Sequence, residues 1–154
     1  MNCEVRHSKP SDASDISKVI ISALRETNSR DYSPEIIASV EESFAPEKVE
    51  ALIAKRTVFT AEIEGRIVGT ASLDQAVVRT VFVSPDAQGT GVGKLLISSV
   101  IEQARQRGIE KLSVPSTVTA ERFYERMGFK SVRDEYHGDE RTIVMECHLC
   151  PMHS

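Results

Sequence analysis

One strand–turn–helix segment restricts the possible folds of this chain more than any other feature. It begins with Val77–Val83, a run rich in β-branched residues that is typical of a strand. Glycines then occupy every second position, at Gly89, Gly91 and Gly93, and a long amphipathic helix follows until Gly108 ends it. A fold built around this segment needs a sheet with a helix packed against it.

The hydrophobic periodicity elsewhere predicts the remaining elements. The expected strands are residues 2–7, 58–63, 66–73, 77–83, 111–114, 129–134 and 141–149. The expected helices are a segment capped by Ser11 or Asp12 that ends at Leu24, and residues 34–44, 46–53, 92–107 and 119–127. This order predicts a mixed α+β fold, in which about four helices flank one central, mostly antiparallel, twisted sheet of about six to seven strands.

Composition narrows the class of protein. The 154 residues suit a single domain, residues 1–154, which is large enough to bury a core without disulfides. No run approaches the roughly 20 apolar residues that cross a bilayer, and the first residues lack a secretory signal pattern. The net charge of −4 argues against a broad nucleic-acid surface and slightly favours a cationic substrate. With three scattered cysteines, these features predict a cytoplasmic protein that binds neither nucleic acid nor membrane.

The glycine turn predicts an anion site. Alternate glycines leave backbone N–H groups uncovered at the start of the following helix, where the helix dipole also favours negative charge. A phosphate or pyrophosphate is the ligand that this arrangement suits. The alternative is a glycine-rich helix start that binds nothing.

The turn matches neither of two common phosphate-binding loops. A P-loop needs glycine five residues before Gly-Lys-Ser/Thr, but Gln88 stands there and Leu95 follows Lys94. The dinucleotide fingerprint needs a glycine three residues after its second glycine, and Lys94 holds that place. Both patterns are therefore excluded by spacing.

The pattern that fits is Gln-x-x-Gly-x-Gly, formed by Gln88, Gly91 and Gly93. In this motif and the strand before it, the sequence resembles the GCN5-related N-acetyltransferase (GNAT) family. The resemblance implies that acetyl-CoA is the co-substrate and that its pyrophosphate binds at the turn. The residues that it places against the cofactor are Val81, Phe82 and Val83 in the strand and Gln88, Gly89, Thr90, Gly91, Val92, Gly93 and Lys94 in the turn.

A second segment carries the same resemblance. Ala120, the pair Phe123-Tyr124 and the pair Gly128-Phe129 reproduce a second signature of the family. The family often uses the position of Tyr124 as a general acid, which would protonate the leaving thiolate. A thiol pKa near 8.5 and a tyrosine pKa near 10 make this transfer only slightly uphill. The alternative is that the aromatic pair only packs against the core.

The resemblance covers about residues 57–147, and the chain departs from the family pattern within it. Many relatives have asparagine near the start of the second signature helix, where this chain offers Ser116, Thr117 and Thr119. A hydroxyl can replace part of that hydrogen bonding, and Thr117 is the predicted cofactor contact.

The general base has no clear candidate. Many relatives carry a glutamate on the strand that here offers Arg79. Glu62, Asp74 and His7 are possible bases, and a chain of water molecules is the alternative. The resemblance implies that a backbone N–H near Val81 binds the oxyanion of the tetrahedral intermediate.

The predicted acceptor is a primary amine of a small molecule, because the chain shows no additional recognition module. Residues 28–46 are expected to shape its site. Asp31, Glu41 and Glu42 could attract a cationic amine there, or could form a solvated helix face. By analogy with the family, a homodimer is also expected.

Cysteine and histidine residues gather near the end of the sequence, at Cys147, His148, Cys150 and His153. Their spacing matches no familiar zinc pattern, and in a strand Cys147 and His148 would face opposite sides of the sheet. The sequence therefore predicts no metal site.

The leading hypothesis is an N-acetyltransferase that uses acetyl-CoA and a small amine. A protein N-acetyltransferase is the alternative within the same reaction class. A non-catalytic acyl-CoA-binding or regulatory domain and a nucleotide-binding module are the alternatives from other classes.

Overall fold

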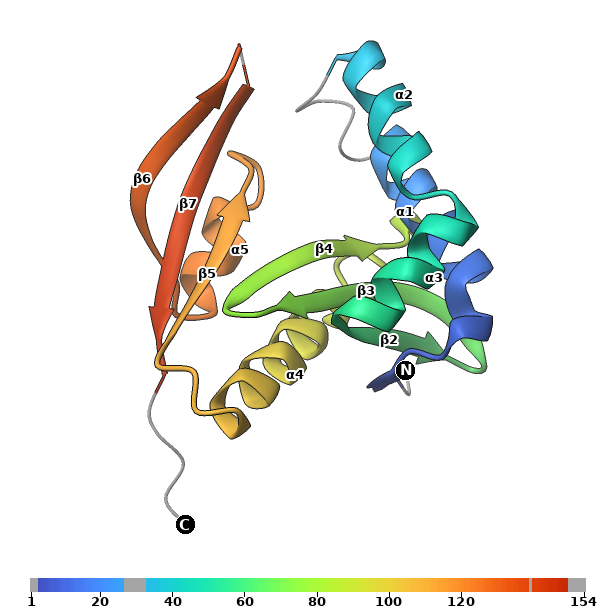
Figure 1. The fold of residues 1–154 in the computed structure, drawn as a ribbon, viewed down its shortest axis with the longest axis horizontal. Coiled ribbons are helices and arrows are strands. Elements are labelled where there is room, and N and C mark those ends of the chain that lie inside the picture. The colour runs from blue at the N-terminus through green and yellow to red at the C-terminus, as the bar shows by residue number, and fades with distance from the viewer. Residues whose placement is uncertain (1–2, 27–32, 139, 150–154) are drawn as a thin grey trace.

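The computed structural model describes residues 3–26, 33–138 and 140–149. A seven-stranded sheet runs in the order β1-β2-β3-β4-β5-β7-β6 (Figure 1). Its strands are β1 (Cys3–His7), β2 (Thr57–Ile63), β3 (Arg66–Asp74), β4 (Val77–Val83), β5 (Lys111–Ser116), β6 (Lys130–His137) and β7 (Glu140–His148). The helices are α1 (Ala13–Glu26), α2 (Pro34–Ser43), α3 (Pro46–Lys55), α4 (Val92–Gln106) and α5 (Glu121–Arg126). Short 3-10 turns are η1 (Pro10–Asp12) and η3 (Pro85–Ala87).

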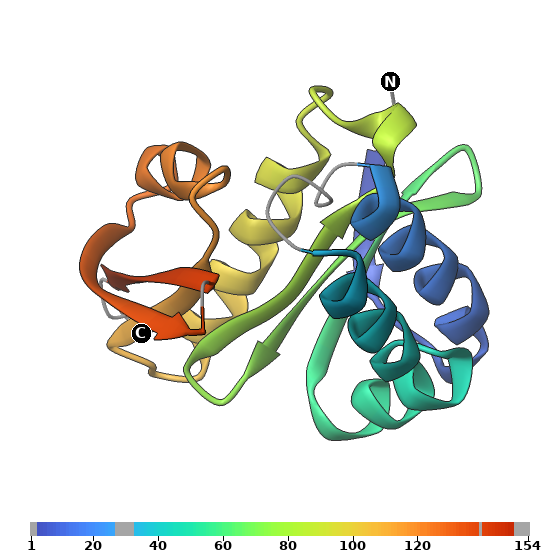
Figure 2. The ribbon, with the colours of Figure 1, turned by 90° about the horizontal axis from the view of Figure 1, so that it is seen from above.

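Helices cover both faces of the sheet. Helix α4 packs on one face of β1–β4, and α1 and α3 pack on the other (Figure 2). Strand β3 lies between these layers, and Val68 and Leu73 within it are fully buried with Leu96 and Val100 of α4. Burying each such side chain contributes roughly 1.5–3 kcal/mol. None of the helices in the described ranges is long and apolar enough to cross a membrane.

The sheet splits between β4 and β5. The two strands run parallel but pair only at Val77 and Ser113, and they diverge beyond that point (Figure 1). The N–H of Ser113 donates to the Ala76 carbonyl at 2.9 Å, so the nitrogen of Pro115, two residues on, faces the same side. Proline has no N–H to donate, so it loses no ladder bond where β4 has moved away. The split opens the space that the cavities described below occupy.

A β-bulge distorts β4 next to this split. Thr70 pairs with Phe82 and Ser72 with Arg79, so β4 has one residue more than β3 across the same interval. Thr80 takes a φ of 56°, which is rare for a β-branched residue. Bulges of this kind bend a strand and redirect its side chains.

The predicted mixed α+β fold with a mostly antiparallel sheet is confirmed. Helix α5 begins at Glu121 rather than at residue 119, because the carbonyl and hydroxyl oxygens of Thr117 both accept from the Ala120 N–H at 3.2 Å. Strand β5 extends past Pro115 to Ser116, and β6 extends to His137 rather than stopping at residue 134. Strand β6 is an exposed edge, so its last residues need no apolar alternation.

Candidate active site

The turn between β4 and α4 presents backbone donors. Gly91 is the N-cap residue of α4, takes a φ of 89° and makes no side-chain capping bond. The left-handed conformation is available to glycine without strain, and an added side chain there would meet no atom within 4 Å. The first N–H groups of this 15-residue helix therefore face the turn together with the positive end of the helix dipole.

A cavity of about 500 Å³ lies beside this turn, and we name it the turn cavity. The predicted cofactor-site residues that line it are Val81, Phe82, Val83, Gln88, Gly89, Gly91, Gly93, Lys94 and Thr117, and the predicted catalytic residue Tyr124 lines it too. Thr90 and Val92 do not line it. The Thr90 hydroxyl donates to the Ala87 carbonyl at 2.5 Å, and the Val92 side chain is buried in the core. Only the backbone of Val92 is thus placed to meet a ligand at the turn.

Two contacts fix the shape of the turn cavity. The Gln88 side-chain amide donates to the Val83 carbonyl at 3.1 Å, which ties the turn to the end of β4. A Cβ at Gly93 would lie 3.4 Å from the Phe123 ring and 3.8 Å from Val83. Glycine at this position therefore keeps the passage between β4 and α5 open.

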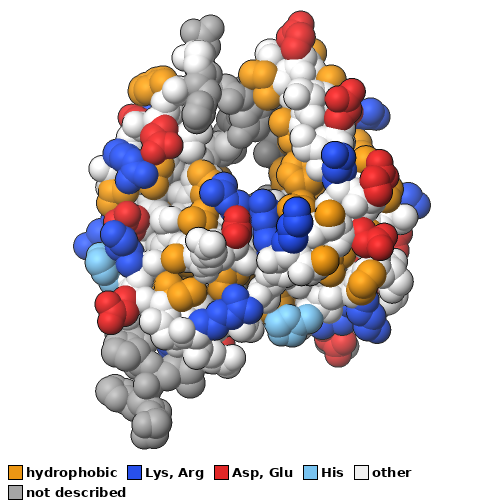
Figure 3. All heavy atoms as spheres, viewed as in Figure 1, with side chains coloured by type: hydrophobic (Ala, Val, Ile, Leu, Met, Phe, Trp, Pro, Cys, Tyr) orange, Lys and Arg blue, Asp and Glu red, His pale blue; other side chains and the backbone are white. Residues whose placement is uncertain are grey.

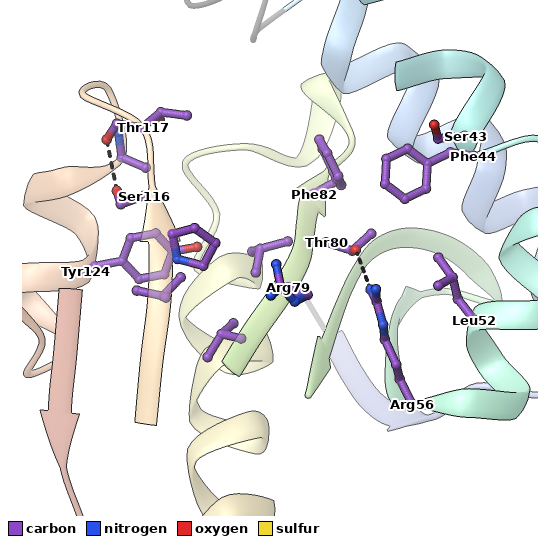
Figure 4. A pocket seen from close by; sticks show the side chains of 15 residues that line it. Ser43, Phe44, Leu52, Arg56, Arg79, Thr80, Phe82, Ser116, Thr117 and Tyr124 are labelled. Carbon is purple, nitrogen blue, oxygen red and sulfur yellow. Dashed lines mark hydrogen bonds between the residues drawn. The ribbon is translucent and has the colours of Figure 1, made fainter. Parts of the chain in front are cut away.

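A second cavity, of about 440 Å³, lies farther along the split, and we name it the α3 cavity. Its lining includes Ser43 and Phe44 at the end of α2, and Leu52 and Arg56 from α3 and the residue after it. Arg79, Thr80, Val114, Pro115 and Ser116 line its strand side (Figure 4). The residues that line both cavities are Val81, Phe82, Thr117, Ala120 and Tyr124. A ligand in the turn cavity and a ligand in the α3 cavity would meet at this shared wall.

Tyr124 lies at the shared wall. Its ring packs edge-on against Phe123, with centroids 5.1 Å apart, and against Phe129 at 5.6 Å. Figure 4 shows it pointing from α5 toward β4. The side chain is only 6% exposed, and this burial raises the pKa of the phenol. Tyr124 is therefore protonated at neutral pH and can donate a hydrogen bond. Its ring also packs, so the packing and donor interpretations are compatible.

The family model for the acetyltransferase (GNAT) domain matches residues 28–149. The chain belongs to the GNAT family. The uncharacterized N-acetyltransferase YafP of Escherichia coli is 31% identical over 137 residues, which cover 87% of this chain and 85% of that protein. The [ribosomal protein bS18]-alanine N-acetyltransferase of Haemophilus influenzae is 35% identical over 86 residues, 50% of this chain and 59% of that protein. The expected enzyme class, an acetyl-CoA-dependent N-acetyltransferase, is confirmed at the level of the family.

Solved GNAT structures share the fold. The GCN5-related N-acetyltransferase of Rhodopseudomonas palustris superposes with a TM-score of 0.88 at 23% identity, over 97% of each chain. The PaiA N-acetyltransferase of Thermoplasma acidophilum, solved in complex with coenzyme A, gives 0.84 at 20% identity, over 96% of this chain and 99% of that one. The predicted GNAT-like architecture is thereby confirmed.

The possible general bases of this GNAT enzyme lie away from the shared wall. Glu62 accepts a hydrogen bond from Arg6 at 2.6 Å, and the His7 ring packs against Phe59 with centroids 4.8 Å apart. Asp74 pairs with Arg56 and Arg79, which line the α3 cavity, but Asp74 is not itself part of the lining. Within the described part of the chain, Glu62, Asp74 and His7 line neither cavity. None of these three side chains therefore forms part of the shared wall.

Residues 28–46, which are expected to shape the acceptor site, contribute two residues to the lining of the α3 cavity. Ser43 and Phe44 line this cavity. Glu41 instead pairs with Arg25 at 2.6 Å, and Glu42 is exposed. Asp31 lies outside the described residues.

Sequence reasoning missed two features of the GNAT site. Arg56 lines the α3 cavity although it follows a short helix that carries no motif. Arg79 was noticed only for the missing glutamate, and its position on β4 was the available signal. No group of three or more His, Cys, Asp or Glu residues that could hold a metal is found among the described residues. Cys150 and His153 lie outside those residues.

Proposed function

We propose that this enzyme transfers the acetyl group of acetyl-CoA to a primary amine of a small molecule. The pyrophosphate would bind the N–H groups of the glycine turn, and the thioester would lie at the wall shared by the turn cavity and the α3 cavity. The observation that carries the proposal is this shared wall, because it joins an anion site to a second cavity of about 440 Å³. That volume lies within the range of small-ligand sites.

The open edge of β4 is the proposed track for the pantetheine arm. Beyond Val77 this edge has no backbone pairing with β5. Backbone groups of Val81 and the N–H of Val83 would bond the amides of the arm, as an added strand would, while the Val83 carbonyl already accepts from the Gln88 side chain. Thr117 lines the opposite side of the passage, where its hydroxyl already accepts from the Ala120 N–H.

The proposed chemistry is direct transfer. The neutral amine nitrogen attacks the thioester carbonyl carbon and loses one proton to a chain of water molecules. The C–S bond of the tetrahedral intermediate then breaks, and CoA leaves as a thiolate that gains a proton. An N–H near Val81, beside the bulge at Thr80, would bind the oxyanion. Tyr124 would donate a hydrogen bond to the sulfur. Because burial raises its pKa, the hydrogen bond contributes more than complete proton transfer does.

The names of relatives do not select one acceptor. They refer to an alanine of a ribosomal protein, to glucosamine 6-phosphate and to an amino acid. A protein acceptor is therefore the second candidate. The single-domain organisation of residues 1–154, the cytoplasmic location and the homodimer stay predictions.

The test measures thiol release from acetyl-CoA with amine acceptors, alongside equilibrium binding of acetyl-CoA. We expect acetyl-CoA to bind and thiol to appear faster with amine than without it. Binding without amine-dependent release on small or peptide amines would favour a non-catalytic acyl-CoA-binding domain. Failure to bind acetyl-CoA, with ATP or NADH bound instead, would contradict the proposal altogether.

A further inference from the structure

Two arginine side chains line the α3 cavity. Arg56 follows the end of α3, and Arg79 projects from β4 (Figure 4). Their side chains are 21% and 45% exposed, so both remain reachable from solvent. Figure 3 shows basic side chains, with an acidic one among them, at the bottom of the hollow between the β5–β7 side and the α2 side of this face.

The local charge of this cavity is positive. Arg56 and Arg79 share one carboxylate oxygen of Asp74, at 3.6 Å and 3.3 Å from their Nε atoms. One negative charge therefore faces two positive charges. The Arg56 Nη1 group also donates to the Thr80 hydroxyl at 3.3 Å. Among the described residues, no carboxylate lines the α3 cavity.

The rest of the lining is suited to a small carbon skeleton. Phe44 and Phe82 pack edge-on with centroids 6.0 Å apart, and Leu52 lines the same cavity. A guanidinium offers a planar set of donors that matches a carboxylate or a phosphate in two-point contact. A cationic acceptor would instead meet the excess positive charge without a carboxylate to pair with.

From these contacts we infer that the acceptor amine carries an anionic group, a carboxylate or a phosphate, and that Arg56 and Arg79 bind it. The inference rests on the proposed function, because that function makes the α3 cavity the acceptor site. It reverses the weak preference for a cationic substrate that the net charge of −4 indicates. The charge inside the cavity determines which acceptor binds, because salt screens the effect of exposed charges beyond about 8–10 Å at physiological ionic strength.

The experiment compares acceptors that differ only in the anionic group. Leucine is compared with leucinamide, glucosamine 6-phosphate with glucosamine, and spermidine serves as the cationic acceptor. We expect kcat/KM at least about tenfold higher for an anionic member than for its neutral partner, as for a charged hydrogen bond. The pair that responds identifies carboxylate or phosphate as the group recognised.

Arginine variants then test which side chains carry the preference. Arg56→Gln and Arg79→Gln are each expected to raise KM for the anionic acceptor about ten- to hundredfold and leave KM for acetyl-CoA unchanged. The matched control is Arg133→Gln on β6, whose side chain is 57% exposed, pairs with Glu135 at 3.0 Å and lines neither cavity. It should leave both KM values unchanged.

A binding measurement keeps the inference testable without turnover. Inorganic phosphate or acetate is added to protein saturated with acetyl-CoA, which occupies the turn cavity. The anion should raise the unfolding temperature of the wild type, and the Arg56→Gln, Arg79→Gln double variant should lose that increase. Equal or faster acetylation of neutral or cationic amines, or absence of the anion effect, would overturn the inference while leaving the proposed function standing. A retained anion effect with no turnover on any amine would instead overturn the proposed function.

Discussion

The turn cavity and the α3 cavity share a wall but are built from different parts of the chain. The turn cavity is formed largely by residues 81–94, which run consecutively through a strand end, a turn and a helix start. The α3 cavity is formed by side chains from α2, α3, β4 and β5 that meet only in the folded chain. The first site depends on local backbone conformation and the second on tertiary packing. Substitutions should therefore separate cofactor binding from acceptor binding.

The largest expected effect is on the turn. Gly91→Glu places a carboxylate where the pyrophosphate is proposed to bind, so affinity for acetyl-CoA should fall at least about 100-fold. Gly108→Glu is the matched control at the other end of α4, since its φ of +75° gives similar strain and it too has no atom within 4 Å of an added Cβ. Calorimetry with acetyl-CoA and circular dichroism measure affinity and folding. Equal affinity of the two variants for acetyl-CoA would contradict a pyrophosphate site at Gly91.

The shared wall should respond in rate rather than in binding. Tyr124→Phe removes the donor but keeps the ring packed against Phe123 and Phe129, so kcat should fall about 100-fold. KM for acetyl-CoA should stay within about twofold of the wild-type value, because the lost hydrogen bond forms in the transition state and not in the bound ground state. Because burial raises the Tyr124 pKa, ionisation of this phenol should not reduce wild-type kcat near pH 10. Tyr136→Phe, at a 63% exposed position on β6, is the control, and equal loss there would contradict the assignment.

A substitution in the α3 cavity should weaken binding of the acceptor and leave binding of acetyl-CoA unchanged, which is the reverse of the result expected at the turn. Phe44→Ala removes a half-buried ring from the α3 cavity, so KM for the acceptor should rise about tenfold and acetyl-CoA affinity should not change. The lost packing should also lower the unfolding temperature by a few degrees, as roughly 1 kcal/mol does in a domain of this size. Leu95→Ala, at a 44% exposed position on α4, is the control for removing an apolar side chain. A weakened acetyl-CoA site in Phe44→Ala would show that the cavities are not separable.

The smallest expected effect is on stability, and it comes from Asp12, a charged residue that lines neither cavity. Asp12 accepts hydrogen bonds from Arg6 at 2.8 and 3.1 Å and from the Lys9 N–H at 2.7 Å, and the Arg6 bonds are the main cause that lowers the Asp12 pKa. Because the pKa of Asp12 is lower in the folded state, its ionised form stabilises the fold at pH values above the unfolded-state pKa of about 3.9. This stabilisation is lost as the pH falls through the folded-state pKa. Asp12→Asn should thus reduce the free energy of unfolding by roughly 1–2 kcal/mol at pH 7, with the difference narrowing below about pH 4.

Urea unfolding across this pH range measures the Asp12 effect. Asp15→Asn, an exposed carboxylate on α1, serves as the control and should change the free energy of unfolding less. Neither variant should alter KM for acetyl-CoA or for the acceptor. A pH-independent loss in Asp12→Asn would mean that packing, rather than charge, accounts for it.

The same distinction explains what could be predicted from the sequence. The glycine turn was recognisable because its donors are backbone groups whose exposure follows from the glycine spacing itself. The split of the sheet was harder to foresee, because its register depends on β4 and β5 pairing only at Val77 and Ser113. The predicted strand stopped at residue 114, before Pro115, whereas β5 continues to Ser116. The missing N–H of a proline ends a strand only where a neighbouring strand would accept a hydrogen bond from it.

The acceptor side could not be predicted in the same way. Arg56 and Phe44 reach the α3 cavity through the packing of α2 against α1 and of α3 against α1 and β2, which no local pattern specifies. Glu62 and His7 were plausible bases by residue type, but they lie on strands β2 and β1 outside the lining of either cavity. The catalytic role of Tyr124 and the cofactor contacts stay predictions, which the variants above are designed to test.

The central claim is that main-chain N–H groups at Gly91 bind a diphosphate, and a double comparison tests it most directly. Binding of acetyl-CoA and of S-acetylpantetheine, which lacks the pyrophosphate together with the 3′-phosphoadenosine, is measured for the wild type and for Gly91→Glu. The account predicts that the wild type prefers acetyl-CoA strongly and that the variant loses this preference, which gives a large coupling between the two changes. An equal preference in both proteins would show that the pyrophosphate binds elsewhere and would contradict the account.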